Sequence, residues 1–184
     1  MQIIYYPLPD SPFLSPEEVV NSFDLKNGEK ALDFGAGSGY WAIPLARAVG
    51  REGHVFVTDT KKENLSVIKA KAEKAGLDNI SYYEFVINES LSPVQTKVDL
   101  ILVSNVISDS VDFEEILKEV KKLAKIGTKL IIIEWKKDAV IGPKKENRID
   151  PESVILKAAK SGFQFKKLLS AGAHHTGFFF VYEK

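Results

Sequence analysis

The sequence contains no cysteine among its 184 residues and only one methionine. The absence of cysteine excludes disulfide bonds, thiolate nucleophiles and the zinc or iron–sulfur sites that depend on thiolate ligands. It also removes cysteine usage as a clue to the redox compartment. A thermophilic source is one explanation for so few oxidation-prone residues, and chance is another.

A surplus of either charge is also missing, because 25 Lys and Arg balance 25 Asp and Glu. Nucleic-acid-binding proteins usually carry a basic excess that neutralises phosphates, so we expect no nucleic-acid partner. No apolar run reaches the ~18 residues of a membrane helix, and the start, MQIIYYPLPD, lacks the regions of a secretory signal. We therefore expect no membrane partner and a cytoplasmic location, and the oligomeric state stays open.

Short apolar runs typical of strands alternate with helix-like stretches from Lys30 onward. Strands are expected at 30–34, 55–58, 81–86, 98–103 and 129–134. Helices are expected at 40–49, 60–75, 112–125 and 150–161. This alternation predicts an α/β fold, a parallel sheet with helices on both faces. The last two strands, 163–169 and 178–182, are too close for a helical crossover, so they should form an antiparallel hairpin.

Single residues predict several of the helix boundaries. Thr60 and Glu63 have the spacing of a capping box, and Gly127 is expected to end the helix at 112–125. Asp150 should cap the last helix. The length fits one domain over 1–184, with an N-terminal arm and short helix at 1–25 and a catalytic core at 26–184.

The strongest chemical signal is the segment Asp33–Gly39, DFGAGSG, between a predicted strand and a predicted helix. Its glycines permit a tight turn and the close approach of a ligand, and the helix N-terminus after it offers N–H groups. Asp59 ends the next predicted strand, where a carboxylate can accept hydrogen bonds from a ribose diol. The pattern therefore predicts a nucleoside ligand at the carboxyl ends of the strands.

The spacing of the glycines indicates which nucleoside. A dinucleotide-binding loop reads G-x-G-x-x-G, but the position of its third glycine is held by Tyr40. The spacing is G-x-G-x-G, with Asp33 two residues before the first glycine. A carboxylate there repels a pyrophosphate and attracts a cation such as the amino group of a methionine-like moiety. This favours S-adenosylmethionine over NAD, with a glycine-rich turn that binds no ligand as the alternative.

The segment Asp33–Gly39 resembles the glycine loop of class I S-adenosylmethionine-dependent methyltransferases. The resemblance continues almost to the end of the chain, through Thr58–Thr60, Val98–Asn105 and Ala124–Leu130. A further set resembles the small-molecule branch, which includes the ubiquinone and menaquinone biosynthesis methyltransferases: Glu134–Lys137, Gly142, Pro143, Arg148 and Ser161–Phe163.

The resemblance implies a Rossmann-like three-layer sandwich with a seven-stranded, mostly parallel sheet in the order 3-2-1-4-5-7-6. It also implies S-adenosyl-L-methionine as cofactor and no metal. The implied contacts are, for the methionine end, Asp33, Gly35, Ala36, Gly37 and Gly39; for the ribose, Asp59 and Thr60; and beside the sulfonium, Ser104, Asn105 and Val106. An acid often follows the third strand in this family to hold the adenine amine. Here Asn88, whose oxygen can accept that bond, is preferred to Glu89.

The chain departs from the family in places. Ala36 replaces Cys or Gly, and Ala124 and Thr128 replace Leu and Gly in the segment before the fifth strand, changes that we expect to be neutral for catalysis. The frequent His after the fourth strand is replaced around Ser108 and Asp109, so whatever that His does is in doubt here.

Methyl transfer is an in-line displacement, and it needs a base only when the acceptor must lose a proton. The candidates are Asp109 and, in the turn between the last strands, His174 and His175, for which a solvated polar turn is the simpler interpretation. Trp135 could wall an apolar pocket or cap the sheet edge. Arg148 could bind an acidic substrate or a surface carboxylate.

The sequence therefore predicts methyl transfer from S-adenosylmethionine to a small-molecule acceptor. A non-catalytic S-adenosylmethionine-binding module and an NAD(P)-dependent oxidoreductase are the rival hypotheses, and the glycine spacing disfavours the oxidoreductase.

Overall fold

The computed structural model describes residues 15–85, 94–107 and 113–184 of the chain. Its helices are α1 (Pro16–Asn21), α2 (Ala42–Ala48), α3 (Lys62–Lys74), α4 (Phe113–Leu123), α5 (Pro151–Lys160) and the 3₁₀ turn η1 (Lys145–Asn147). Its strands are β1 (Lys30–Phe34), β2 (His54–Asp59), β3 (Ile80–Glu84), β4 (Val98–Ser104), β5 (Ala124–Trp135), β6 (Phe163–Ser170) and β7 (His175–Tyr182). Within the described ranges, no helix has the length and apolar character needed to cross a membrane.

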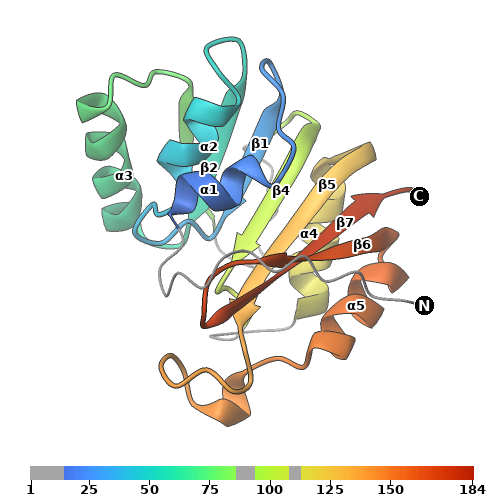
Figure 1. Ribbon diagram of the computed structural model, residues 1–184. Helices are drawn as coiled ribbons and strands as arrows, with labels where there is room; N and C mark the ends of the chain where they lie inside the picture. Colours follow the sequence, from blue (N-terminus) through green and yellow to red (C-terminus); the bar gives the residue numbers. More distant parts are fainter. Residues whose placement is uncertain (1–14, 86–93, 108–112) are drawn as a thin grey trace.

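The strands form one sheet in the order β3-β2-β1-β4-β5-β7-β6, which confirms the predicted topology. The first five strands are parallel, whereas β7 runs antiparallel to both β5 and β6. In Figure 1 the arrowheads of β4 and β5 accordingly point down and that of β7 points up. Because Trp135 at the end of β5 pairs with His175 at the start of β7, the turn at 171–174 lies at the carboxyl edge of the parallel strands.

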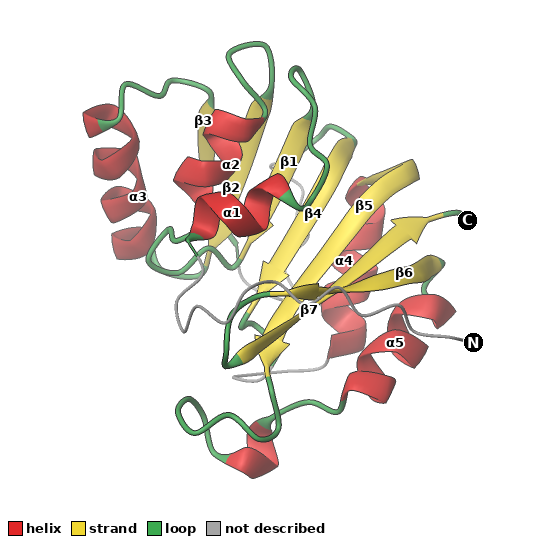
Figure 2. Ribbon diagram, viewed as in Figure 1, coloured by secondary structure: helices red, strands yellow, loops and turns green. Residues whose placement is uncertain are grey.

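Helices cover both faces of the sheet (Figures 1 and 2) and complete the three layers. The face under α1, α2 and α3 buries alternate strand residues such as Ala31, Leu100 and Ile131. The opposite face, under α4 and α5, buries their neighbours, including Leu32 and Ile101. Consecutive residues of β1 and β4 thus belong to different cores, as expected for parallel strands that are buried on both sides.

Two helix boundaries differ from those predicted. Thr60 does not cap α3, which begins at Lys62, and Lys61 and Asn64 instead donate to Asp59 Oδ1, each at 2.9 Å. The capping position is held by Lys61, which makes no side-chain capping bond, and the Asp59 carboxylate instead ties Lys61 and the side chain of Asn64 to the end of β2. By contrast, the cap expected at Asp150 is present, since Oδ2 of Asp150 accepts from two N–H groups at the start of α5.

The second difference concerns the start of β5. Helix α4 ends at Leu123, so the prediction that Gly127 would end it was wrong, and β5 already begins at Ala124. The buried Thr128 explains this early change, because its hydroxyl donates to Val98 O at 2.6 Å and accepts from Lys125 N at 2.9 Å. The side chain ties the first residues of β5 to β4 and satisfies backbone groups that would otherwise be buried without partners.

Candidate functional site

The segment Asp33–Gly39 contains the last two residues of β1 and most of the loop that leads to α2, and all three of its glycines have positive φ angles. A Cβ added to Gly35 (φ +71°) would lie 2.6 Å from Cγ2 of Val106, so this glycine lets the loop after β4 lie directly on the glycine loop. A Cβ on Gly37 (φ +54°) would meet nothing within 4 Å. Gly35 is therefore needed for packing, whereas Gly37 presents an open backbone surface to a ligand.

The N–H groups of this loop are mostly used inside the protein. Gly35 and Ala36 both donate to Thr58 O at 2.9 Å, and Gly39 donates to Ala36 O at 2.9 Å. Gly37 donates to Oδ2 of Asp59 at 2.7 Å. These four N–H groups therefore fix the shape of the loop by bonds within the protein.

Asp33 is a buried carboxyl group at the start of this loop, with only 1% of its surface exposed. Its Oδ2 atom has no hydrogen-bond partner within the described part of the chain. Burial, and then the nearby charge of Asp59, raise the pKa of Asp33 to about 7. A cation placed next to Asp33 would satisfy the orphaned oxygen and favour its ionised form.

Asp59 ends β2, as predicted, and its two carboxylate oxygens accept hydrogen bonds from different segments. Oδ2 anchors Gly37 in the loop, and Oδ1 accepts from Lys61 and Asn64 at the start of α3. The side chain is buried and connects the two segments on which a nucleoside would rest. Thr60 is exposed and stands next to this connection rather than within it.

The turn after β4 approaches the loop from the other side. Asn105 has φ +55°, a conformation that asparagine tolerates better than most residues, and its N–H donates to Ile133 O. Ile107 N donates to Oε1 of the buried Glu134 at 2.9 Å. The side-chain oxygens Ser104 Oγ and Asn105 Oδ1 are buried and, among the described residues, have no hydrogen-bond partner. Unsatisfied polar atoms of this kind are typical of a binding site.

These segments surround a cavity of about 450 Å³, a size that is usual for a ligand site. Seven of the predicted site residues line it together: Gly35, Ala36, Gly37, Ser104, Asn105, His174 and His175. The remaining wall comes from α1, the start of α2, the end of β5 and the loop after it, and includes Val19, Trp41, Ile133 and Ile141. Asp33, Gly39, Asp59, Thr60 and Val106 do not belong to this lining, and Asn88, Glu89 and Asp109 lie outside the described residues.

The sequence did not predict the hydrogen bonds that fix the wall opposite the glycine loop, which consists of the loop after β5 and the turn between β6 and β7. The Arg148 guanidinium donates, at 2.6–3.2 Å, to five backbone carbonyls: Lys136 O, Lys137 O, Ala139 O, Ile141 O and Pro143 O. It therefore binds neither an acidic substrate nor a surface carboxylate, the two partners that we expected. Lys136 Nζ donates to Gly172 O and Ala173 O in the turn between β6 and β7. No local motif could have signalled these contacts, because each joins separate segments of irregular backbone.

Trp135 supports the cavity from behind and does not line it. Its ring lies 4.1 Å, centroid to centroid, from that of His175. A Cβ on Gly142 (φ +102°) would lie 2.5 Å from Cε3 of the indole, so the loop after β5 lies directly against the six-membered ring of Trp135. Of the two alternatives for this tryptophan, capping the sheet edge is the one that fits.

Comparison with known proteins places this site in a family. The family model described as methyltransferase domain matches residues 25–172. A demethylmenaquinone methyltransferase of Bacillus mycoides (strain KBAB4) is 31% identical over 126 residues, which cover 68% of this chain and 53% of the relative. This chain thus spans about half the length of the curated relatives it matches.

Solved structures agree with this result. A SAM-dependent methyltransferase from Aquifex aeolicus matches with a TM-score of 0.82 and 27% identity, covering 93% of this chain and 91% of that one. A ribosomal protein L11 methylase from Lactobacillus delbrueckii subsp. bulgaricus matches with a TM-score of 0.66 and 17% identity, covering 92% and 77% of the two chains. The second likeness concerns the fold alone.

The described residues fit S-adenosylmethionine as a ligand. The amino group of this ligand is a cation that could pair with the unpartnered Asp33 Oδ2. The open side of Gly37 permits the close approach that a nucleoside requires. On the family match and this chemistry together, the chain belongs to the methyltransferase domain family, among the members that use S-adenosylmethionine as cofactor.

Proposed function

We propose that this protein transfers a methyl group from S-adenosylmethionine to a small, uncharged acceptor. The observation that carries the proposal is the shared cavity, which has the glycine loop on one side and the turn between β6 and β7 on the other. When bound, the cofactor supplies a methyl group on a positively charged sulfur, so that an acceptor's electron pair forms the new bond and the old pair stays with sulfur. Positioning alone can supply much of the rate of such a displacement.

On this proposal, the cofactor lies along the carboxyl ends of β1, β2 and β4. Asp33 pairs with the amino group, the backbone of Gly35 and Gly37 contacts the methionine portion, and Asp59 accepts from the ribose. Among the described residues, Oδ2 of Asp59 accepts one bond, from Gly37, which leaves a second lone pair for a ribose hydroxyl. Ser104 and Asn105 then stand where the donor and the acceptor meet.

The character of the acceptor follows from the rest of the lining. Among the described lining residues, none is Asp, Glu, Lys or Arg, and most of the wall is apolar or small. A charged acceptor would lose its hydration in this cavity without gaining a counter-charge from a lining side chain. The relatives named demethylmenaquinone methyltransferase suggest a quinone-type ring as acceptor, and such a ring suits this lining.

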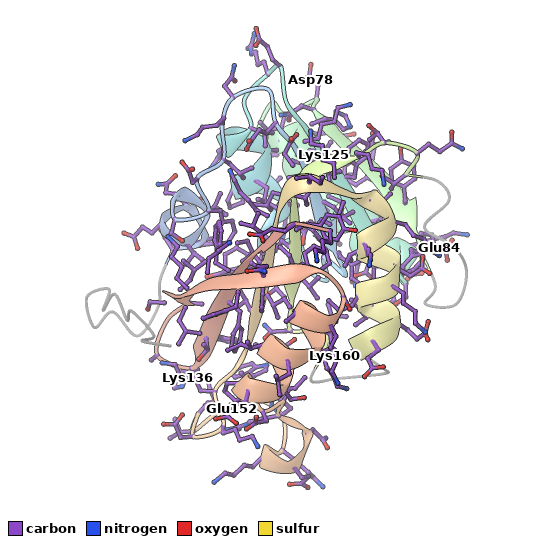
Figure 3. All side chains as sticks on the ribbon, turned by 90° about the vertical axis from the view of Figure 1, so that its right-hand side faces the viewer. Asp78, Glu84, Lys125, Lys136, Glu152 and Lys160 are labelled. Atoms are coloured by element: carbon purple, nitrogen blue, oxygen red, sulfur yellow. The ribbon has the colours of Figure 1, made fainter. Side chains whose placement is uncertain are left out.

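The cofactor part of the proposal is tested by thermal unfolding of the wild type, Asp59→Ala and Asp78→Ala, each with and without S-adenosylmethionine. Asp78 is an exposed carboxylate at the amino edge of the sheet (Figure 3) and serves as the matched control. A ligand at about 100 times its Kd stabilises by about 2.7 kcal/mol. We expect this stabilisation in the wild type and in Asp78→Ala, and a much smaller one in Asp59→Ala. An equal shift in all three would exclude the ribose role.

The catalytic part requires a different measurement. Incorporation of radiolabelled methyl into a panel of hydroquinones, phenols, amines and carboxylic acids should occur with the neutral ring acceptors. Binding of the cofactor without turnover on any acceptor would support a non-catalytic binding module instead. A dinucleotide released from the purified protein on denaturation would support the oxidoreductase.

A further inference from the structure

His175 is the first residue of β7, and its half-buried side chain lines the cavity opposite the glycine loop. Its Nε2 atom is fully buried and has no hydrogen-bond partner within the described part of the chain. A buried ring nitrogen without a partner is costly unless a ligand satisfies it. This atom therefore marks a position at which the acceptor can be bound.

His175 is held more firmly than its neighbour His174, which lines the same cavity. His175 belongs to a strand, pairs with Trp135 in the sheet and packs its ring on that indole. The indole is in turn held by the backbone at Gly142. His174 instead lies in the turn. Groups that act on a substrate are most effective on rigid elements whose side chains are fixed by packing.

The surroundings keep His175 in its neutral form. Burial lowers its pKa to about 4, with smaller effects from the charges of His174 in the turn and Lys136 after β5. At neutral pH the imidazole is therefore uncharged, so one ring nitrogen carries a lone pair that can accept a hydrogen bond.

The other unpartnered atoms of the cavity complete the chemistry. Ser104 Oγ and Asn105 Oδ1 are buried like His175 Nε2, and all three residues line the cavity. Three residues that carry unpartnered hydrogen-bonding atoms, in an otherwise largely apolar lining that includes the aromatic Trp41, match a flat ring that carries hydroxyl groups. They do not match a hydrocarbon, which would leave all three unsatisfied.

We infer that His175 Nε2 accepts the hydroxyl proton of a phenolic or enolic acceptor as that acceptor is methylated, an inference that rests on the proposed function. The O–H bond breaks, its electron pair stays on the acceptor, and an N–H bond forms on Nε2. In the same step the acceptor gives an electron pair, from oxygen or from a ring carbon, to the methyl group, and the pair of the broken S–C bond stays on sulfur. After the product leaves, the low proton affinity of the buried ring returns the proton to water.

A weakly basic imidazole is sufficient for this step. A hydroxyl group becomes far more acidic as its oxygen, or the ring attached to it, gives up electron density to a new bond. The proton therefore moves late, when even a base of low pKa is stronger than the acceptor.

The first test needs no cofactor. The chain has three histidines, so their ¹⁵N-labelled rings give a small set of NMR signals that His→Gln variants assign. Adding 4-methoxyphenol should shift the Nε2 signal of His175 and leave that of His54 unchanged, because His54, at the start of β2, is bonded to Ser81 of β3 and does not line the cavity. A shift confined to His174, or none at all, would overturn the assignment.

The second test separates a proton acceptor from a residue that only shapes the cavity. Methylation of 4-nitrophenol, ionised at mildly alkaline pH, is compared with that of 4-methoxyphenol, which is not. In His175→Gln and in His175→Phe, which keeps an aromatic ring on Trp135, kcat for 4-methoxyphenol should fall about 100-fold or more. For 4-nitrophenol it should fall far less, and His54→Gln should behave like the wild type with both.

An equal loss with the two phenols would mean that His175 has only a structural role. Wild-type protein that binds the phenol at His175 but methylates no acceptor would refute the proposed function rather than the contact. Wild-type protein that methylates only amines would refute the inferred acceptor class.

Discussion

The two walls of the cavity are held in place by opposite kinds of hydrogen bond. In the glycine loop, main-chain N–H groups donate to Thr58 O and to the Asp59 carboxylate. In the opposite wall, two cationic side chains donate to main-chain carbonyls: Arg148 holds the segment after β5, and Lys136 holds the turn between β6 and β7. One wall is therefore shaped by backbone geometry, and the other by the reach of two side chains.

This difference indicates how the two walls can change. The glycine loop depends on positive φ angles and a close contact at Gly35, which few substitutions preserve. The opposite wall requires that Arg148 and Lys136 keep their partners and that Gly142 lies close against Trp135, while Val140, 86% exposed, has no packing role in the core. On the proposed function, the glycine-loop wall therefore suits the cofactor, which is the same in every reaction. The opposite wall tolerates substitutions that would change which acceptor ring is bound.

The largest effect is expected from Asp33→Asn, because only the glycine-loop wall contains a buried carboxyl whose pKa is strongly raised. The native pKa of about 7 exceeds the ordinary value of 3.8, so above pH 4 the unfolded chain loses a proton that the native protein keeps. Stability is therefore lost as pH rises to about 7, by up to about 4 kcal/mol. The amide of the variant does not titrate, so urea unfolding at pH 5 to 8 should show a growing advantage for Asp33→Asn.

The exposed Asp138 of the opposite wall provides the control. The difference in free energy of unfolding between Asp138→Asn and the wild type should stay nearly constant over the same pH range. If the Asp33→Asn difference were equally constant, the carboxyl would be ionised in the native state, and the two walls would not differ electrostatically.

The next largest effect is expected from Arg148→Lys, which keeps the charge but replaces a planar, five-donor group by a compact ammonium. The lysine cannot reach five carbonyls, so local stability of 136–143 should fall by about 2 kcal/mol. Hydrogen exchange of these amides should then accelerate about 30-fold, while that of the glycine loop stays unchanged. The KM for the acceptor should rise without a change in cofactor affinity.

Arg47→Lys is the matched control, since Arg47 makes a single 3.4 Å contact to Glu17 on the surface. It should leave exchange in 136–143 as in the wild type. Faster exchange in both walls after Arg148→Lys would show that they are mechanically coupled, contrary to the expected independence of the two walls.

The same contrast explains what the sequence could predict. The strands, the hairpin and the glycine loop follow from patterns that are local in the chain: apolar runs, glycines at fixed spacing, and Asp59 at the end of a strand. The sheet order was implied by the resemblance to class I methyltransferases, and the structure confirms it. The capping box expected at Thr60 was wrong by one residue: Lys61 holds the capping position, and Asp59 accepts from Lys61 N. Short-range signals suffice where the backbone itself forms the structure.

The opposite wall could not be predicted for the same reason. Arg148 contacts carbonyls 5 to 12 residues away, and Lys136 contacts carbonyls 36 and 37 residues away. A carbonyl belongs to every residue, so these partners leave no mark in the sequence. The sequence therefore suggests only charged partners for Arg148, an acidic substrate or a carboxylate. For the same reason it leaves open whether Trp135 lines a pocket or packs behind His175.

The smallest effect is expected from Lys136→Met, which keeps the aliphatic stem and removes the ammonium that ties the turn to β5. The turn loses the two hydrogen bonds from Nζ, and His175 loses a nearby positive charge, so the measured effect is a shift of the His175 pKa. Because that charge disfavours the imidazolium, its removal should raise the pKa of His175, as measured by NMR titration.

Lys137→Met, which removes a neighbouring ammonium paired with Asp150, should leave the pKa of His175 unchanged. The rise should be small, since burial is the leading cause of the lowered pKa and persists in the variant; an unchanged pKa would mean that Lys136 holds the wall without influencing its chemistry.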